Sequence, residues 1–220
     1  MDYIANSLAY KRVYDGRLKT ISPLVCGLGA LHVLETSITL HHIWGVPYIP
    51  GSSLKGVCRQ VVFWRFVEKR GMSEGEAQDF QKKFDEKLQK DDKEILKYQL
   101  LFGAQDFKGL LLFLDAYPTE GEKLLRLEIM NPHYSSYYRG ETKEAGDWEN
   151  PIPVFFLTVK EGVPFRFVVL FDQYRWERIK EKYKEINLEI GNKEIEDIIK
   201  EALNLYGVGS KTRLGYGLFE

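Results

Sequence analysis

Two prolines three positions apart, Pro47 and Pro50, determine where the first long helix of this chain can begin. Proline lacks the backbone N–H that an inner helical position needs, and it disfavours helical geometry in the residue before it. The chain must therefore be extended up to Pro50. Ser52 and Ser53 are favourable N-cap residues, and apolar residues at near-helical spacing follow them. We expect a helix that is capped by these serines, runs to about Lys69 and has one apolar face.

The rest of the chain predicts strands and helices around a long charged insertion. Residues 71–101 are rich in Glu, Lys, Gln and Asp around sparse apolar residues, and they predict one or two solvated helices. The first 31 residues show no regular pattern. The predicted strands are residues 33–40, 109–116, 124–130, 154–159, 165–171 and 214–219, and further helices are predicted over residues 174–184 and 195–206.

The apolar patterns also predict how some strands are placed. Residues 109–116 are almost unbroken in apolar character, which indicates burial on both faces, and we expect strand 124–130 beside them. Strands 154–159 and 165–171 predict a hairpin around the turn at residues 161–164.

The order of the elements predicts the fold class. Without the insertion the order is β-α-β-β-α-β, which is the split βαβ arrangement of ferredoxin-like and RRM-like folds. We therefore expect an α+β fold in a single domain over residues 1–220, with a helical insertion at about 71–101 and an extra hairpin.

A long aromatic loop is predicted over residues 131–153, with the sequence NPHYSSYYRGETKEAGDWENPIP. Tyrosine and tryptophan mixed with Arg139 can stack on unpaired bases. They can equally pack the loop onto its own domain or bind a neighbouring subunit. We favour packing or a subunit contact over base stacking.

Composition excludes several classes of protein. The net charge of −1 argues against a protein that coats nucleic acid by charge alone, although it permits a local basic face. Cys26 and Cys58 are expected to be small buried apolar groups, and no CxxC or HxxxH spacing predicts a metal site or a cofactor. No apolar stretch approaches the roughly 20 residues that span a bilayer, and the amino terminus lacks the features of a signal peptide. We therefore expect a cytoplasmic protein with no membrane contact.

A glycine-rich run near the carboxyl end is the first candidate site. Gly207, Gly209 and Gly215 are interleaved with Lys211 and Arg213. Glycines allow backbone N–H groups to approach a phosphate closely, and the two cations supply charge and directed donors. The run follows a helix and enters a strand, so it is not a dinucleotide fingerprint, and it lacks the Walker A pattern. The structural alternative is a helix stop followed by a tight turn.

The start of the helix after Pro50 is the second candidate site. A helix N-terminus carries partial positive charge and free amides, so Ser52 and Ser53 would mark an anion site. Lys55 and Arg59 lie four positions apart and share a helix face. The structural alternative is an ordinary cap with a solvated lysine. We predict that this helix start and the glycine-rich run form one continuous phosphate-binding surface.

The histidines are the third candidate. One of His41, His42 and His133 would be the general base of a metal-independent ribonuclease, acting on a ribose 2′-OH. Nothing in the sequence positions a second acid or base, and adjacent histidines point to opposite sides of an extended chain. We therefore predict no catalytic residue.

Several longer motifs together resemble one known family. The run GLGALHVLETSITLHHIWGVPYIPGSSLKGVCR is followed in order by LFGAQDFKGLLLFLDAYP, NPHYSSYY, DWENPIPVFFLTV and ALNLYGVGSKTRLGYG. From about Gly27 to Gly217 the chain resembles the sixth Cmr subunit of type III-B CRISPR effector complexes, within the RAMP superfamily. The PGSSLKG and glycine-loop elements identify the superfamily alone, whereas NPHY and DWENPIP are more specific. Ala30 and Leu31 depart from the expected small polar-proline pair.

The resemblance implies a function in antiviral defence. It implies an RRM-like, non-catalytic structural subunit at the end of a helical stack of related subunits, in contact with guide (crRNA) and target single-stranded RNA and with other Cmr subunits. The strand around residues 110–114 is too apolar to display stacking aromatics, so we expect RNA contact through the two basic elements. The alternative is a stand-alone RAMP endoribonuclease that processes guide precursors with a histidine base.

Overall fold

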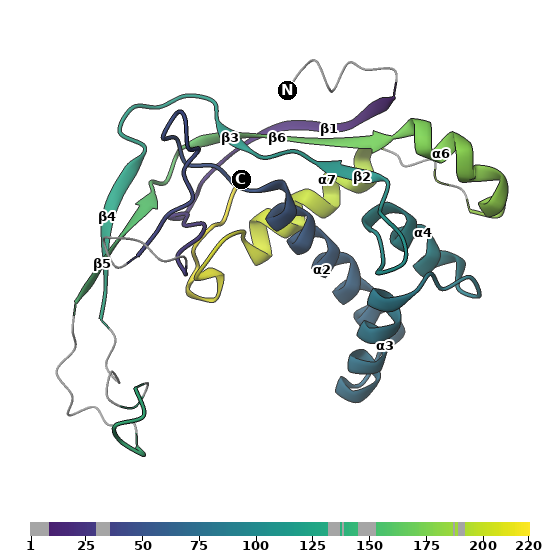
Figure 1. The fold of residues 1–220 in the computed structure, drawn as a ribbon, viewed down its shortest axis with the longest axis horizontal. Coiled ribbons are helices and arrows are strands. Elements are labelled where there is room, and N and C mark those ends of the chain that lie inside the picture. Colours follow the sequence, from purple (N-terminus) through teal and green to yellow (C-terminus); the bar gives the residue numbers. More distant parts are fainter. Residues whose placement is uncertain are drawn as a thin grey trace.

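A four-stranded antiparallel sheet forms the centre of the computed structural model, which describes residues 9–29, 36–131, 137, 139–144, 153–186, 188 and 192–220. The long strand β6 (Pro164–Asp172) lies in the middle of this sheet. It pairs with β1 (Tyr10–Lys19) along one edge, and with β2 (Leu111–Phe113) and β3 (Tyr117–Pro118) along the other. Figure 1 shows α2 (Gly51–Arg70) and α7 (Asn192–Glu201) beneath this sheet.

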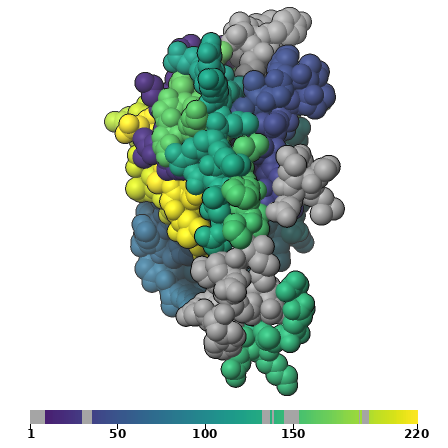
Figure 2. Space-filling model, turned by 90° about the vertical axis from the view of Figure 1, so that its left-hand side faces the viewer, coloured from purple at the N-terminus to yellow at the C-terminus, as the bar shows by residue number. Residues whose placement is uncertain are grey.

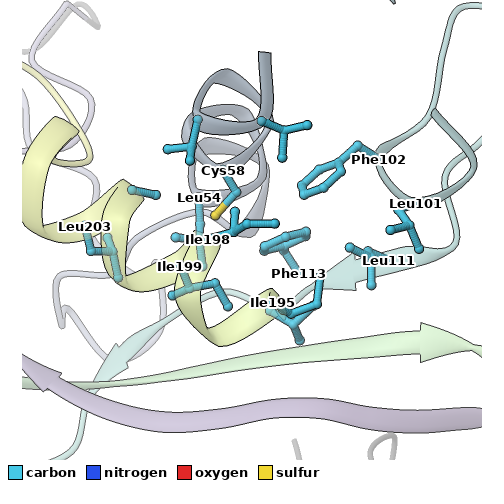
Figure 3. Packing of buried hydrophobic residues seen from close by; sticks show 14 of the residues in the cluster. Leu54, Cys58, Leu101, Phe102, Leu111, Phe113, Ile195, Ile198, Ile199 and Leu203 are labelled. Carbon is cyan, nitrogen blue, oxygen red and sulfur yellow. The ribbon is translucent and has the colours of Figure 1, made fainter. Parts of the chain in front are cut away.

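These two helices, α2 (Gly51–Arg70) and α7 (Asn192–Glu201), build the main core against the sheet. Figure 3 shows Leu54 and Cys58 of α2 pointing towards Ile198 of α7. All three side chains are buried, so their removal from water stabilises the contact between the helices. Burial also raises the pKa of the Cys58 thiol to about 12, which fits the predicted apolar role of the two cysteines.

Two further helices, α3 (Glu74–Glu86) and α4 (Lys93–Phe102), occupy the predicted insertion. They are solvated on one side only, because Phe80 and Phe84 of α3 pack their rings against the aromatic side chains of α2. The fully buried Gln99 joins α4 to the end of α3, where its Nε2 donates to the carbonyl of Phe84 at 3.1 Å. The insertion therefore extends the core.

The remaining helical segments lie in the carboxyl-terminal half. The predicted helices at residues 174–184 and 195–206 are confirmed, although each changes its geometry along its length. The first consists of α6 (Gln173–Ile179) and a 3₁₀ turn (Lys180–Tyr183). The second consists of α7 and the π-helical segment (Ala202–Tyr206) that continues it. A separate 3₁₀ turn (Thr212–Leu214) follows.

A separate two-stranded ribbon stands beside the sheet and consists of β4 (Leu125–Met130) and β5 (Val154–Val159). The predicted β5–β6 hairpin is therefore wrong, and so is the expected pairing of strand 124–130 with strand 109–116. The reason lies at Thr20, whose hydroxyl donates to Lys160 O at 2.7 Å and accepts from Val163 N at 3.0 Å. These bonds hold the link between β5 and β6, so the two strands enter different sheets.

Three further strand predictions need correction. The first strand of the structure is β1, which lies within the first 31 residues, where the sequence showed no pattern. The predicted first strand, residues 33–40, is not formed in its described part, since residues 36–40 contain only a bridge from Leu40 to Pro47. Residues 33–35 lie outside the described part. The predicted last strand is reduced to an isolated bridge between Thr20 and Phe219. Leu112 of β2 is 37% exposed, so the strand is not buried on both faces.

Two other expectations, the long loop at 131–153 and the absence of a membrane span, can be compared with the described residues only. Most of the predicted loop at 131–153 lies outside them, with only residues 131, 137, 139–144 and 153 described. Within the described part of the chain, no helix is both long and apolar enough to cross a membrane.

Candidate nucleic-acid interface

The start of α2 is capped differently from the prediction. Pro50 is the N-cap residue, and Ser52 and Ser53 lie in the first turn without a side-chain capping bond, so the predicted serine caps are wrong. The first amide, Gly51 N, instead donates to Oδ1 of Asp115 at 2.8 Å. The partial positive charge of the helix start is thus already met in part by a carboxylate of the protein.

Arg59 of α2 is held by neighbouring protein groups. Its guanidinium forms an ion pair with Asp85 at 2.6 Å and donates to the carbonyl of Phe84 at 3.1 Å. The guanidinium also lies 5.0 Å from the centroid of the Phe84 ring. These contacts attach α2 to the end of α3, so a large part of the charge of Arg59 is used within the protein.

Lys55 has the surroundings that an anion would favour. The half-buried side chain lies near two other cations, Arg59 and Lys108. Burial lowers the pKa of Lys55, and repulsion from Arg59 and Lys108 lowers it further. Among the described residues Lys55 has no hydrogen-bond or ion-pair partner. An anion bound here would relieve this repulsion.

The glycine-rich run folds back over the segment that follows β1. Ser210 N donates to Val25 O at 2.7 Å, and Gly217 N donates to Pro23 O at 2.8 Å. Gly209 has a φ of +100°, and a Cβ there would collide with the carbonyl oxygen of Val25. Glycine at position 209 is therefore required by the packing of the protein itself.

Two other glycines of the run differ from each other in their surroundings. Gly207 has a φ of +72°, and a Cβ there would lie 2.8 Å from the carbonyl oxygen of Tyr216. Gly215 has a φ of +84°, but nothing lies within 4 Å of a Cβ added to it. Gly215 is thus the one of the three predicted glycines with open space beside its Cα, and its N–H donates to Thr212 O at 2.9 Å.

The two cations of the run point to different surroundings. Lys211 has a φ of +62°, rare for a side-chain-bearing residue, and its Nζ lies 4.9 Å from the centroid of the Phe156 ring on β5. Arg213 is exposed in the 3₁₀ turn, and no ion pair involves it among the described residues. Figure 2 shows the yellow carboxyl-terminal segment beside the teal and green segments that include β4 and β5.

A single groove joins the two predicted elements. It has a volume of about 730 Å³, and Ser53, Gly56 and Arg59 of α2 line it together with Gly209 and Ser210. The structure thus brings the helix start and the glycine-rich run together, although they are far apart in the sequence. Of the four predicted cations, only Arg59 lines the groove, so the others lie outside its lining.

An aromatic cluster in the loop between Thr39 and Pro50, two residues that line this groove, was missed by the sequence reasoning. Thr39 lines the groove, and His41 follows it in a short loop where its ring stacks on that of Trp44, with centroids 4.2 Å apart. A second stacked pair, Tyr48 and Tyr117, adjoins His41. The run of aromatic residues from position 41 to 48 was the available signal.

Two of the three histidines considered as a general base, His41 and His42, lie within the described residues. Nδ1 of His41 accepts from the backbone N–H groups of Ile43 and Trp44, at 3.3 and 3.4 Å. His133 lies outside the described residues. Among the residues that are described, no group of three or more His, Cys, Asp or Glu side chains is placed to hold a metal ion.

Comparison with known proteins identifies relatives. Residues 17–220 match the model of the RAMP superfamily. The chain is 36% identical over 243 residues to the CRISPR system Cmr subunit Cmr6 of Pyrococcus furiosus, covering 92% of this chain and 66% of that protein. It is 27% identical over 222 residues to Cmr6 of Saccharolobus solfataricus, covering 99% of this chain and 60% of that protein. The chain thus spans less than two thirds of the length of these curated relatives.

Solved structures show the same likeness. The crystal structure of Cmr6 from Pyrococcus furiosus matches with a TM-score of 0.59 and 33% identity, covering 96% of this chain and 98% of that one. A chain in the cryo-EM structure of the Type III-B Cmr-beta bound to cognate target RNA matches with a TM-score of 0.65 and 24% identity, covering 100% of this chain and 61% of that one. The second likeness shows the fold alone.

Proposed function

Because this chain belongs to the RAMP superfamily, we propose that it is a structural subunit of a type III-B CRISPR effector complex, of the Cmr6 type, that contacts RNA. The similarity to two Cmr6 proteins supports the subunit type. The proposed partners are guide RNA, target RNA and other Cmr subunits. The fold shared with a chain of the Type III-B Cmr-beta, which was solved bound to cognate target RNA, supports these partners.

We propose that the core is ferredoxin-like. The support is its connectivity, in which β1, α2, β2 with β3, β6 and α7 follow one another along the chain. The carboxyl-terminal segment then returns to β1 through the bridge from Thr20 to Phe219. In space the order is this segment, β1, β6 and β2, with antiparallel neighbours, as a split βαβ arrangement requires. The loop at 131–153 is proposed to contribute to a subunit interface.

The observation that carries the RNA proposal is the shared groove of α2 and the glycine-rich run. RNA backbone would follow this groove and continue past it to Lys55, Lys211 and Arg213, which lie outside its lining and would be the direct cationic contacts. Gly215 would allow close approach, Gly209 and Arg59 line the walls, and Gly207 would hold the run against the backbone of Tyr216. Ser52 is exposed in the first turn of α2, and Ser53 lines the groove, so both would offer hydroxyls. Contact through phosphates would be independent of base sequence.

The subunit is proposed to be non-catalytic. The contacts of one ring nitrogen of His41 support this, because Nδ1 already accepts two backbone N–H groups and its lone pair is not directed at a substrate. The rival function, a guide-processing endoribonuclease, requires such a base.

Charge reversal in the glycine-rich run tests the RNA proposal. Lys211→Glu with Arg213→Glu should weaken guide RNA binding for every RNA sequence, and the matching Ala variants should lower the salt slope by up to about 0.7 per lost contact. Lys182→Glu with Lys184→Glu, beyond α6, is a matched control that should leave affinity unchanged. The protein should also co-purify with guide RNA and sister subunits. If the Lys211 and Arg213 variants keep wild-type affinity and salt slope, RNA contact lies elsewhere.

A further inference from the structure

The loop before α2 presents three aromatic rings in nearly parallel planes. The His41 ring stacks on the Trp44 indole, with centroids 4.2 Å apart and planes inclined by 16°. The same ring stacks on His42, with centroids 5.0 Å apart and planes inclined by 19°. His41 is thus common to both pairs. Trp44 lies at one end of the arrangement, and 68% of its surface is exposed. We call these three residues the ring stack.

The backbone of the loop holds the ring stack in place. His41 N donates to Val46 O at 2.8 Å, and Gly45 N donates back to His41 O at 2.7 Å. Nδ1 of His41 accepts the amide of Trp44, so the histidine ring is fixed from both its backbone and its side chain. Because the Trp44 indole stacks on this fixed ring, it would lose little conformational entropy when a ligand stacks on its other face.

The loop that carries the ring stack connects two residues that line the proposed RNA groove. Thr39, two residues before His41, lines the groove, and Pro50 at the start of α2 lines it as well. Figure 2 shows the dark blue segment of the chain that includes this loop at the outer edge of the molecule. A strand of RNA that leaves the groove at Thr39 would therefore pass the exposed face of Trp44.

We propose that the ring stack is a platform for an unpaired nucleobase, which stacks on the exposed face of the Trp44 indole. Parallel aromatic rings with one open face match the flat face of a base, and such stacking tolerates any base. The inference rests on the proposed RNA function and adds to it a base contact, whereas the groove supplies backbone contacts. The Trp44 indole carries no charge, so this contact leaves the salt dependence of binding unchanged.

The test compares Trp44→Leu with Trp44→Phe in the full chain. Leucine keeps an apolar surface but removes the ring, whereas phenylalanine keeps a ring that stacks. The probes are a single-stranded RNA of mixed sequence and an RNA of equal length with abasic riboses, which keeps the phosphates. On the normal RNA we expect Trp44→Leu to lose about tenfold in affinity with an unchanged salt slope, and Trp44→Phe to recover most of the loss. On the abasic RNA, wild type and Trp44→Leu should bind equally.

Several outcomes separate this inference from its premise. Equal affinity of wild type and Trp44→Leu for normal RNA would overturn the platform while leaving the groove proposal intact. An equal loss on the abasic RNA would show that no base is involved. If RNA affinity is unchanged but Trp44→Leu no longer assembles with sister subunits, Trp44 docks protein and the platform is wrong. If wild type binds neither RNA, the RNA part of the proposed function is wrong, and the platform is wrong with it.

Melting temperatures of both variants establish that each is folded, as expected for a side chain so exposed.

Discussion

Gly209 lies so close to the backbone carbonyl of Val25 that a side chain at position 209 would occupy the space of that oxygen. The neighbouring amide, Ser210 N, donates to the same oxygen at 2.7 Å. The turn is therefore built against the chain that follows β1. A glycine that looked from the sequence like an adaptation to phosphate has a structural reason to be glycine.

Substitution of Gly209 should destabilise the protein even without RNA. Gly209→Val adds a collision and forces a side-chain-bearing residue to a φ of +100°, so we expect a loss of roughly 2–4 kcal/mol in the free energy of unfolding. Urea denaturation measures this loss. Gly215→Ala is the matched control, because its φ is also positive but its surroundings are open, and it should cost only about 1 kcal/mol. Wild-type stability of Gly209→Val together with weakened RNA binding would show that the glycine serves a ligand instead.

Thr20 is expected to hold the junction between the sheet and the ribbon. Its side chain is 1% exposed, and its hydroxyl is the partner of both Lys160 O and Val163 N. Thr20→Val keeps the shape but leaves these groups without a partner, which should cost roughly 1–3 kcal/mol by thermal or urea unfolding. Thr119→Val is the control: Thr119 is exposed and its bond to Pro164 O is 3.4 Å long, so little should change. A Thr20→Val protein as stable as wild type would contradict this role.

Asp15 should make stability depend on pH in the acid range. The hydrogen bonds from Arg166 on β6, at 2.9 Å to each carboxylate oxygen, hold the pKa of Asp15 below its usual value despite partial burial. A carboxyl whose pKa is lower in the folded than in the unfolded state, where it is about 3.9, stabilises the protein above that pH. This contribution is lost as the pH falls through the lower folded pKa.

The comparison is between wild type and Asp15→Asn across pH 2 to 7, measured by urea denaturation. Wild type should be more stable than the variant above about pH 4, and the difference should shrink towards zero below it. Asp79→Asn serves as a control, since this exposed carboxylate lies 3.8 Å from Lys82 and should show little difference at any pH. A difference that persists unchanged at low pH would mean that Asp15 stabilises by packing and not by charge.

Removal of the histidines should leave cleavage intact. The triple variant His41→Ala, His42→Ala and His133→Ala should cleave target RNA near the wild-type rate in the assembled complex. A general base contributes on the order of 10²–10⁴-fold, so even a small catalytic role would be visible. Rates at saturating RNA are the required measurement, because weaker binding through the ring stack then has no effect. A drop of that size with the complex assembled would show that a histidine acts in the chemistry and would overturn the non-catalytic proposal.

Local signals predicted the helices well and the strand partners poorly. The prediction of a helix to about Lys69 matches α2, because the prolines determine its start and a 3.6-residue apolar period continues along it. Strand β1 was missed because a register shift between Arg12 and Tyr14 breaks the two-residue alternation, and because most of its side chains are half-exposed or exposed. The missing β5–β6 hairpin depends on Thr20, a contact between distant segments that no local pattern contains.

In the candidate site, too, local signals were predicted and contacts between distant elements were not. Sequence reasoning selected two segments, and the structure places them around one groove. It did not foresee that Arg59 is paired with Asp85, or that Asp115 caps the helix, because both partners come from other elements. The ring stack escaped notice because adjacent histidines were considered as bases and ligands, whereas the loop turns their rings parallel.

The walls of the groove come from α2, the end of α3, the segment after β1 and the glycine-rich run, so the groove exists only while the chain is folded. Any molecule that occupies it must shift the folding equilibrium by mass action. At a free concentration of one hundred times its dissociation constant, a ligand adds about 2.7 kcal/mol to the free energy of unfolding. Occupancy of the groove would thereby slow the loss of this chain to unfolding and proteolysis, and the protein would last longest in a cell where its ligand is abundant.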